Sequence, residues 1–182
     1  MPHYRSVGTV PAKRHTKAFD EDGNRLFEEL VGTEGFSRES ALHSPRGSPS
    51  ANHGVEVVDS PAARPGGGLG PRHFRTGDLS TGADLVTGRR RLLANADVTI
   101  AFARTSAPSP LYRSVVGDEL VYLHEGAARL ESVFGSMDVE AGDYVVIPAG
   151  TTHRWVPSSD LVAALVIESS GHVHIPDKYL SP

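Results

Sequence analysis

Two stretches decide the fold: GDELVYLHEG at residues 117–126 and AGDYVVIPAGTTH at residues 141–153. Each places a Gly-Asp pair before a short apolar run. In the second stretch Gly142 permits a tight turn, Pro148 ends the strand, and Gly150 lets the loop fold back so that His153 points inward. Each stretch therefore predicts a short strand bounded by turns.

The sequence around these stretches also favours strands. Val98, Ile100 and Phe102 alternate with smaller or polar residues, which is the period of two expected of a half-buried strand. Further short apolar runs, each followed by turn residues, lie at 120–123, 128–134, 144–147 and 161–167. We therefore predict an all-β fold, a sandwich or barrel of antiparallel strands, over residues 71–182.

The part before the barrel is polar and loop-rich. Residues 1–36 form a predicted N-terminal arm with isolated hydrophobic side chains. Residues 37–70 are rich in Ser, Pro and Gly and are predicted to be a flexible loop, because they bury too little apolar surface to offset chain entropy.

Composition excludes several classes of protein. The chain has no cysteine, so disulfide scaffolds, thiolate zinc sites and cysteine nucleophiles are ruled out. Residues 1–111 carry 14 basic and 12 acidic side chains, and residues 112–182 carry 4 and 10, which leaves no basic surface for a nucleic acid. Because the sequence shows neither a signal peptide nor a long apolar segment, we expect a cytoplasmic protein without membrane contact.

The two stretches resemble the paired motifs of the cupin superfamily, which implies a double-stranded β-helix. Metal-binding cupins take two His and one Glu from the first motif and one His from the second. Glu119 and His153 occupy two of these positions here. Residues 111–116 contain no His, and Arg113 places a fixed positive charge there. We interpret Glu119 and Arg113 as an ion pair near the barrel mouth and His153 as a hydrogen-bonded structural residue.

The remaining histidines are weaker candidates for a site. His124 is predicted to lie on the surface. His172 and His174 alternate on a strand-like segment and are expected to face the same side as an exposed pair.

Over most of its length the chain resembles the bacterial form of homogentisate 1,2-dioxygenase. Segments with this resemblance, in order along the chain, are Tyr4–Gly8, Lys13–Thr16, Glu34–Ser37, Pro71–Thr76, Gly88–Arg90, Asn95–Val98, Gly117–Tyr122, Gly171–His172 and Tyr179–Ser181. The resemblance is poorest between Ser37 and Gly70.

This resemblance implies a ring-cleaving enzyme of tyrosine and phenylalanine catabolism, which uses Fe(II) and O2 to convert homogentisate to maleylacetoacetate. Members of that family are bicupins about twice as long, with their iron ligands in the carboxy-terminal cupin. Arg113 occupies the position of a ligand His six residues before Glu119. The resemblance therefore implies the non-catalytic amino-terminal half, which binds no iron by itself. It would present an apolar surface to a complementary carboxy-terminal half or to other copies in a homo-oligomer.

Two other hypotheses remain open. In the first, the chain is a stand-alone degenerate cupin that serves as an assembly module or binds a small carboxylate ligand, with Arg113 as the substrate-binding anchor. In the second, it is a small metal-dependent enzyme in which Glu119 and His153 are joined by a third ligand such as His73 or His124.

Overall fold

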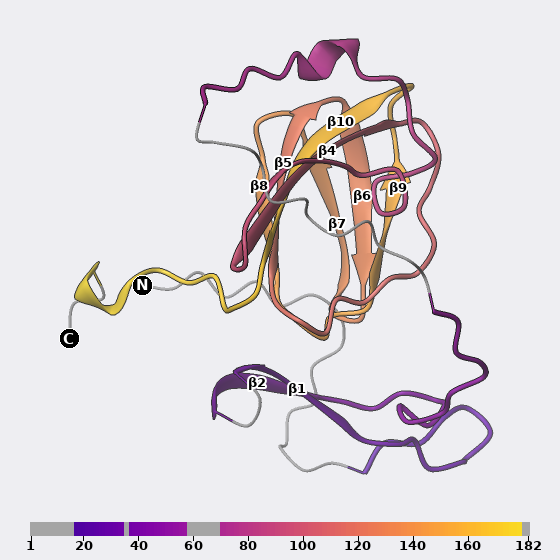
Figure 1. Ribbon diagram of the computed structural model, residues 1–182. Helices are drawn as coiled ribbons and strands as arrows, with labels where there is room; N and C mark the ends of the chain where they lie inside the picture. Colours follow the sequence, from indigo (N-terminus) through magenta and orange to yellow (C-terminus); the bar gives the residue numbers. More distant parts are fainter. Residues whose placement is uncertain (1–16, 35–36, 58–69, 180–182) are drawn as a thin grey trace. The chain divides into compact units, whose positions relative to one another are not determined.

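The computed structural model describes residues 17–34, 37–57 and 70–179. The chain divides into two compact units, one ending at Ala62 and the other beginning at Ala63. Figure 1 shows a small strand pair in the first unit and a two-sheet barrel in the second. Among the described residues no helix has both the length and the apolar character needed to cross a membrane.

The first unit contains strands β1 (Glu29–Glu34) and β2 (Ser37–His43), which pair antiparallel with Leu30 opposite Leu42. The prediction of a flexible loop over 37–70 is therefore wrong for its first seven residues. SRESALH has almost no apolar periodicity of its own, so main-chain pairing with β1 makes it a strand. Residues 44–57 contain no helix or strand, and residues 58–69 and 1–16 lie outside the described residues.

The described residues of the second unit form eight strands in two sheets. They are β3 (Arg90–Ala94), β4 (Val98–Thr105), β5 (Glu119–Glu125), β6 (Ala127–Ser132), β7 (Gly135–Glu140), β8 (Tyr144–Ile147), β9 (His153–Pro157) and β10 (Val162–Ser169). Two short 3₁₀ helices, η1 (Thr76–Asp78) and η2 (Asp177–Tyr179), flank them. The sheet orders are β3-β4-β10-β5-β8 and β7-β6-β9.

The pairing of these strands is nested. The second strand of the unit, β4, pairs with the last, β10; β5 pairs with β8, and β6 with β7. Tyr112, which lies between β4 and β5 in the sequence, forms an isolated bridge with His153 at the start of β9, which lies between β8 and β10. A long hairpin rolled up on itself gives this order, which is that of a jelly roll. The predicted all-β double-stranded β-helix is confirmed.

All five strands that the sequence predicted are present, as β4, β5, β6, β8 and β10. The inward side chains of the two sheets pack into one core, which includes Val121, Leu130, Trp155 and Val166. The predicted turns are confirmed as well. Gly142 has φ 101° and Gly150 has φ 82°, values that side chains disfavour, and His153 is buried.

The five-stranded sheet is apolar on its outer side too. Register places Leu165 between Phe102 and Tyr122, and Ile167 between Ile100 and Leu120. Tyr122 and Leu120 in turn lie opposite Tyr144 and Val146 of the edge strand β8. We call these eight side chains the outer face. Tyr144 is 69% exposed and Val146 is 44% exposed.

Candidate functional site

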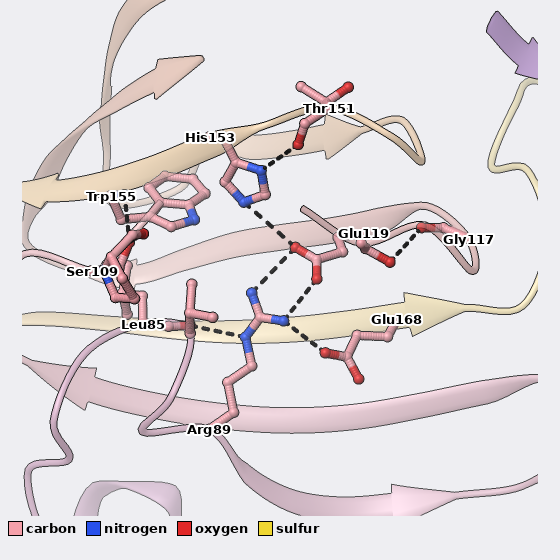
Figure 2. Close-up of polar contacts among 12 residues, drawn as sticks. Leu85, Arg89, Ser109, Gly117, Glu119, Thr151, His153, Trp155 and Glu168 are labelled. Atoms are coloured by element: carbon pink, nitrogen blue, oxygen red, sulfur yellow. Dashed lines mark hydrogen bonds and ion pairs between the residues drawn. The ribbon is translucent and has the colours of Figure 1, made fainter. Parts of the chain in front are cut away.

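Glu119 and His153, the two residues predicted from the motifs, meet inside the barrel (Figure 2). Glu119 begins β5 and His153 begins β9, and each is 1% exposed. His153 Nε2 lies 3.7 Å from Glu119 Oε2. The structure therefore brings a carboxylate and an imidazole from opposite sheets into one buried site.

The cation beside Glu119 is Arg89. Its Nη1 donates to Glu119 Oε1 at 2.8 Å, and its Nη2 donates to Oε2 at 3.2 Å. Nη1 also donates to Glu168 Oε1 at 2.6 Å, and Nε donates to the Leu85 carbonyl at 2.8 Å. One guanidinium thus joins two carboxylates with most of its N–H groups satisfied.

Strand register explains why a cation is needed here. Glu168 lies directly opposite Glu119 in the β10–β5 pairing, and like charges at such positions repel. Burial by itself lowers the pKa of Arg89. The hydrogen bonds and charges of Glu119 and Glu168 outweigh that effect, so the pKa of Arg89 is raised. The guanidinium therefore remains charged and offsets the repulsion.

A tight turn positions Arg89 before β3. The buried Asp84 carboxylate accepts hydrogen bonds from the backbone of Val86 at 2.6 Å and Thr87 at 2.9 Å, and from the Thr87 hydroxyl. The Gly88 N–H donates to the Asp84 carbonyl, and Leu85 inserts into the core. This Asx-type turn fixes the direction in which the arginine side chain leaves the backbone.

Tyr112 packs over the network. Its ring centroid is 5.5 Å from the guanidinium carbon of Arg89 and 5.6 Å from the His153 ring. Burial, and then the negative charge of Glu119, raises the pKa of the Tyr112 hydroxyl. The tyrosine therefore stays neutral and shields the ion pairs.

The buried nitrogens without a hydrogen-bond partner among the described residues include His153 Nε2 and Trp155 Nε1. His153 Nδ1 lies 3.0 Å from the Thr151 carbonyl. A carbonyl can only accept, so Nδ1 carries the hydrogen. The other ring nitrogen, Nε2, points toward Glu119 (Figure 2).

Arg113 lies elsewhere, and the predicted Arg113–Glu119 ion pair is wrong. Arg113 is exposed, and its Nε donates to Thr152 Oγ1 at 2.7 Å. Extended residues alternate direction, so the inward placement of Tyr112 turns its neighbour outward. Arg89 is noted from the sequence only within the segment Gly88–Arg90, and no local pattern links it to Glu119, which is 30 residues away.

The other histidines do not join the site. His73 and His124 are exposed, which agrees with the surface placement predicted for His124. The His172 and His174 rings stack with centroids 5.3 Å apart, so they do share a side. The expectation that both are exposed is wrong for His172. Its side chain is 20% exposed, and its Nδ1 lies 2.6 Å from the buried Asp118 Oδ2.

The donor set does not fit Fe(II). In the described part of the chain, no three His, Asp or Glu side chains converge as metal ligands. The space between Glu119 and Glu168 is filled by a guanidinium, whose fixed charge repels a metal ion.

A cavity of about 290 Å³ opens beside the network. It is lined by residues 95–99, by Tyr112, Ser114 and Val116, and by the end of β10 at 168–170. Glu168 and Tyr112 thus separate the solvent-accessible space from Arg89. Arg113 is not among the lining residues.

Comparison with known proteins places this geometry in context. No family model matches the chain. "Putative dioxygenase SSO1533" of Saccharolobus solfataricus is 31% identical over an alignment of 183 positions, which covers 98% of this chain and 47% of that protein. The chain thus spans about half the length of this curated relative.

Solved structures with a similar backbone include cupins. An RmlC-like cupin family protein with a double-stranded β-helix fold from Methanocaldococcus jannaschii is 16% identical, with a TM-score of 0.48, over 63% of this chain and all of that one. A cupin superfamily protein from Desulfitobacterium hafniense is 17% identical, with a TM-score of 0.47, over 59% of this chain and 98% of that one.

Proposed function

We propose that this chain is the metal-free, supporting barrel of a two-barrel dioxygenase of the homogentisate 1,2-dioxygenase type. The observation that carries the proposal is the Arg89 guanidinium, which bridges Glu119 and Glu168 in the barrel interior. With this position filled, the barrel has no open coordination site for iron and oxygen.

The similarity to a longer protein that is named a putative dioxygenase supports the placement of the iron in a second barrel. Nearly the whole chain aligns with less than half of that relative, so the relative contains a further part of comparable length. In the proposed enzyme, Fe(II) in the second barrel supplies the oxygen chemistry, and homogentisate binds there. This chain contributes a rigid folded support.

The outer face supports the same proposal. Antiparallel sheets with one solvated side usually alternate apolar and polar residues, whereas β10 reads VAALVIES with apolar residues on both sides. The two outer-face side chains on β8, Tyr144 and Val146, are exposed, and an exposed apolar surface marks an interaction site. We assign the second barrel of the same enzyme as the partner that covers it.

Oxygen uptake and metal content test the proposal together. The purified chain is expected to contain far less than one equivalent of iron and to consume no oxygen with homogentisate. Addition of the second barrel is expected to restore uptake, with iron bound by that barrel. Turnover by this chain alone, with about one equivalent of iron, would overturn the proposal. So would a complex of both barrels that binds iron yet leaves homogentisate unchanged.

A further inference from the structure

The cavity of about 290 Å³ beside Arg89 has an acidic lining. Asp97 and Glu168 are the charged residues that line it, and no Lys, Arg or His is among the lining residues. Arg89, behind the cavity wall, does not neutralise them, because it faces both Glu119 and Glu168 and leaves one negative charge uncompensated. Asp97 adds a second. A ligand that enters this cavity therefore meets negative charge.

Glu168 is placed to accept hydrogen bonds from such a ligand. One of its oxygens, Oε1, accepts from Arg89 Nη1 at 2.6 Å, and the other is turned away from the guanidinium (Figure 2). Thr99 lies directly opposite Glu168 in the β4–β10 pairing, so its hydroxyl lies on the same side of the sheet. The side chain of Glu168 is 37% exposed, which leaves it accessible from the cavity. These oxygens are acceptors for a group rich in N–H donors.

The rest of the lining suits an alkyl chain. Val98 and Val116 contribute methyl groups, and Tyr112 contributes an aromatic ring. The volume equals that of about ten water molecules at roughly 30 Å³ each, which is more than a bare ion needs and enough for a small organic molecule. Apolar walls with a few polar groups that fix orientation are typical of small-molecule sites.

We propose that this cavity binds a small alkylammonium ion. Its ammonium group donates hydrogen bonds to Glu168 and Thr99. Its alkyl chain packs against Val98 and Val116, and Asp97 attracts the cation from solvent. An anion, homogentisate included, would meet two carboxylates and no cation in the lining. The inference is independent of the proposed dioxygenase function, and either can fail without the other.

An NMR titration of the ¹⁵N-labelled, tag-free chain with n-butylamine tests the inference at neutral pH, where the amine is protonated. Three further probes are titrated at the same ionic strength. 1-Butanol has the same size without the charge, butyrate has the opposite charge, and ammonium chloride has the charge without the alkyl chain. Chemical shifts of the backbone amides measure both the position and the affinity of binding.

Three variants are titrated beside the unchanged chain. Glu168→Gln removes the carboxylate that contacts the ligand, and Asp97→Asn removes the second negative charge without touching Arg89. Asp160→Asn is the matched control, because Asp160 is exposed and precedes the start of β10, whereas the cavity lies at the end of that strand.

We expect n-butylamine to shift the amides of residues 97–99 and 168–170 to saturation, whereas the other three probes should not saturate them. Glu168→Gln should weaken binding of n-butylamine about tenfold or more, since it removes a charge-assisted hydrogen bond. Asp97→Asn should weaken it about two- to fivefold, and Asp160→Asn should leave it unchanged.

Four results would each overturn the inference. They are the absence of saturable shifts around the cavity, equal saturation by 1-butanol or ammonium chloride, tighter binding of butyrate, and an equal affinity for n-butylamine in Asp97→Asn and Asp160→Asn. If Glu168→Gln does not fold, the four probes and the Asp97→Asn variant still decide the outcome.

Discussion

A buried guanidinium is tolerated only when its charge and its N–H groups are matched, and Arg89 meets both requirements through Glu119, Glu168 and the Leu85 carbonyl. The same residues explain why this barrel holds a charge network where an apolar core would be simpler. Glu119 and Glu168 need a cation, and a side chain supplies it permanently. At the scale of single residues, the site is thus specified by charge matching.

Close backbone contact gives the first prediction at this scale. A Cβ on Gly117 would lie 1.8 Å from the Ser169 carbonyl oxygen, which belongs to the main chain and cannot move aside easily. Gly117→Ala should lower the free energy of unfolding by about 3 kcal/mol or more, measured by urea denaturation. Gly77→Ala is the control, because its Cβ would meet nothing within 4 Å. Equal stability of the two variants would contradict the structure.

Tyr112 gives a prediction about pH. Its pKa in the folded chain is raised above the ordinary value of 10.0 by burial and by Glu119. Above pH 10 the unfolded chain therefore loses this proton first, and the associated stability, intact at lower pH, falls as pH rises toward the folded pKa. Urea denaturation between pH 9 and 11.5 should show a smaller loss of stability for Tyr112→Phe than for the unchanged chain. Parallel curves would mean that the hydroxyl is not shielded.

At the scale of elements, the period-two pattern predicts β4, and a short apolar run before turn residues predicts β5. β7 was missed because GSMDVE has only two apolar side chains, and β9 because His153 and Trp155 face inward within a stretch that looks like a loop motif. The contact of Arg89 with Glu119 joins a turn to a strand 30 residues further along the chain, which no local sequence pattern encodes.

Strand β10 allows its two sides to be compared. Val166 is 1% exposed and points into the core, whereas its neighbour Leu165 belongs to the half-buried outer face. Val166→Ala should lower the free energy of unfolding of the isolated chain by about 2 kcal/mol, since it leaves a cavity. Leu165→Ala should cost clearly less, although it removes more atoms. Thermal and urea unfolding of both variants provide the measurement, and a larger loss at Leu165 would contradict the assigned sides.

At the scale of the whole molecule, the outer face links the barrel to its proposed role. The sheet β3-β4-β10-β5-β8 ends in β8, whose Tyr144 and Val146 are exposed although both are apolar. Isolated apolar side chains on a surface need no explanation, but here they continue a patch across four strands. A partner that covers this patch would remove from water the apolar surface that the chain by itself leaves exposed.

A charge placed at the edge of the outer face tests binding of the second barrel without a large effect on the stability of the isolated chain. Val146→Lys should weaken binding of the second barrel by about tenfold or more, because a buried ammonium without a partner costs at least about 1.4 kcal/mol. The thermal midpoint of the isolated chain should change little, since Val146 is 44% exposed there. Ser136→Lys is the matched control, because it adds the same charge to an exposed position on β7 of the other sheet. Titration calorimetry of both variants with the second barrel measures the difference. If both bind equally well, the partner lies on another surface, and the outer face must be assigned a different role.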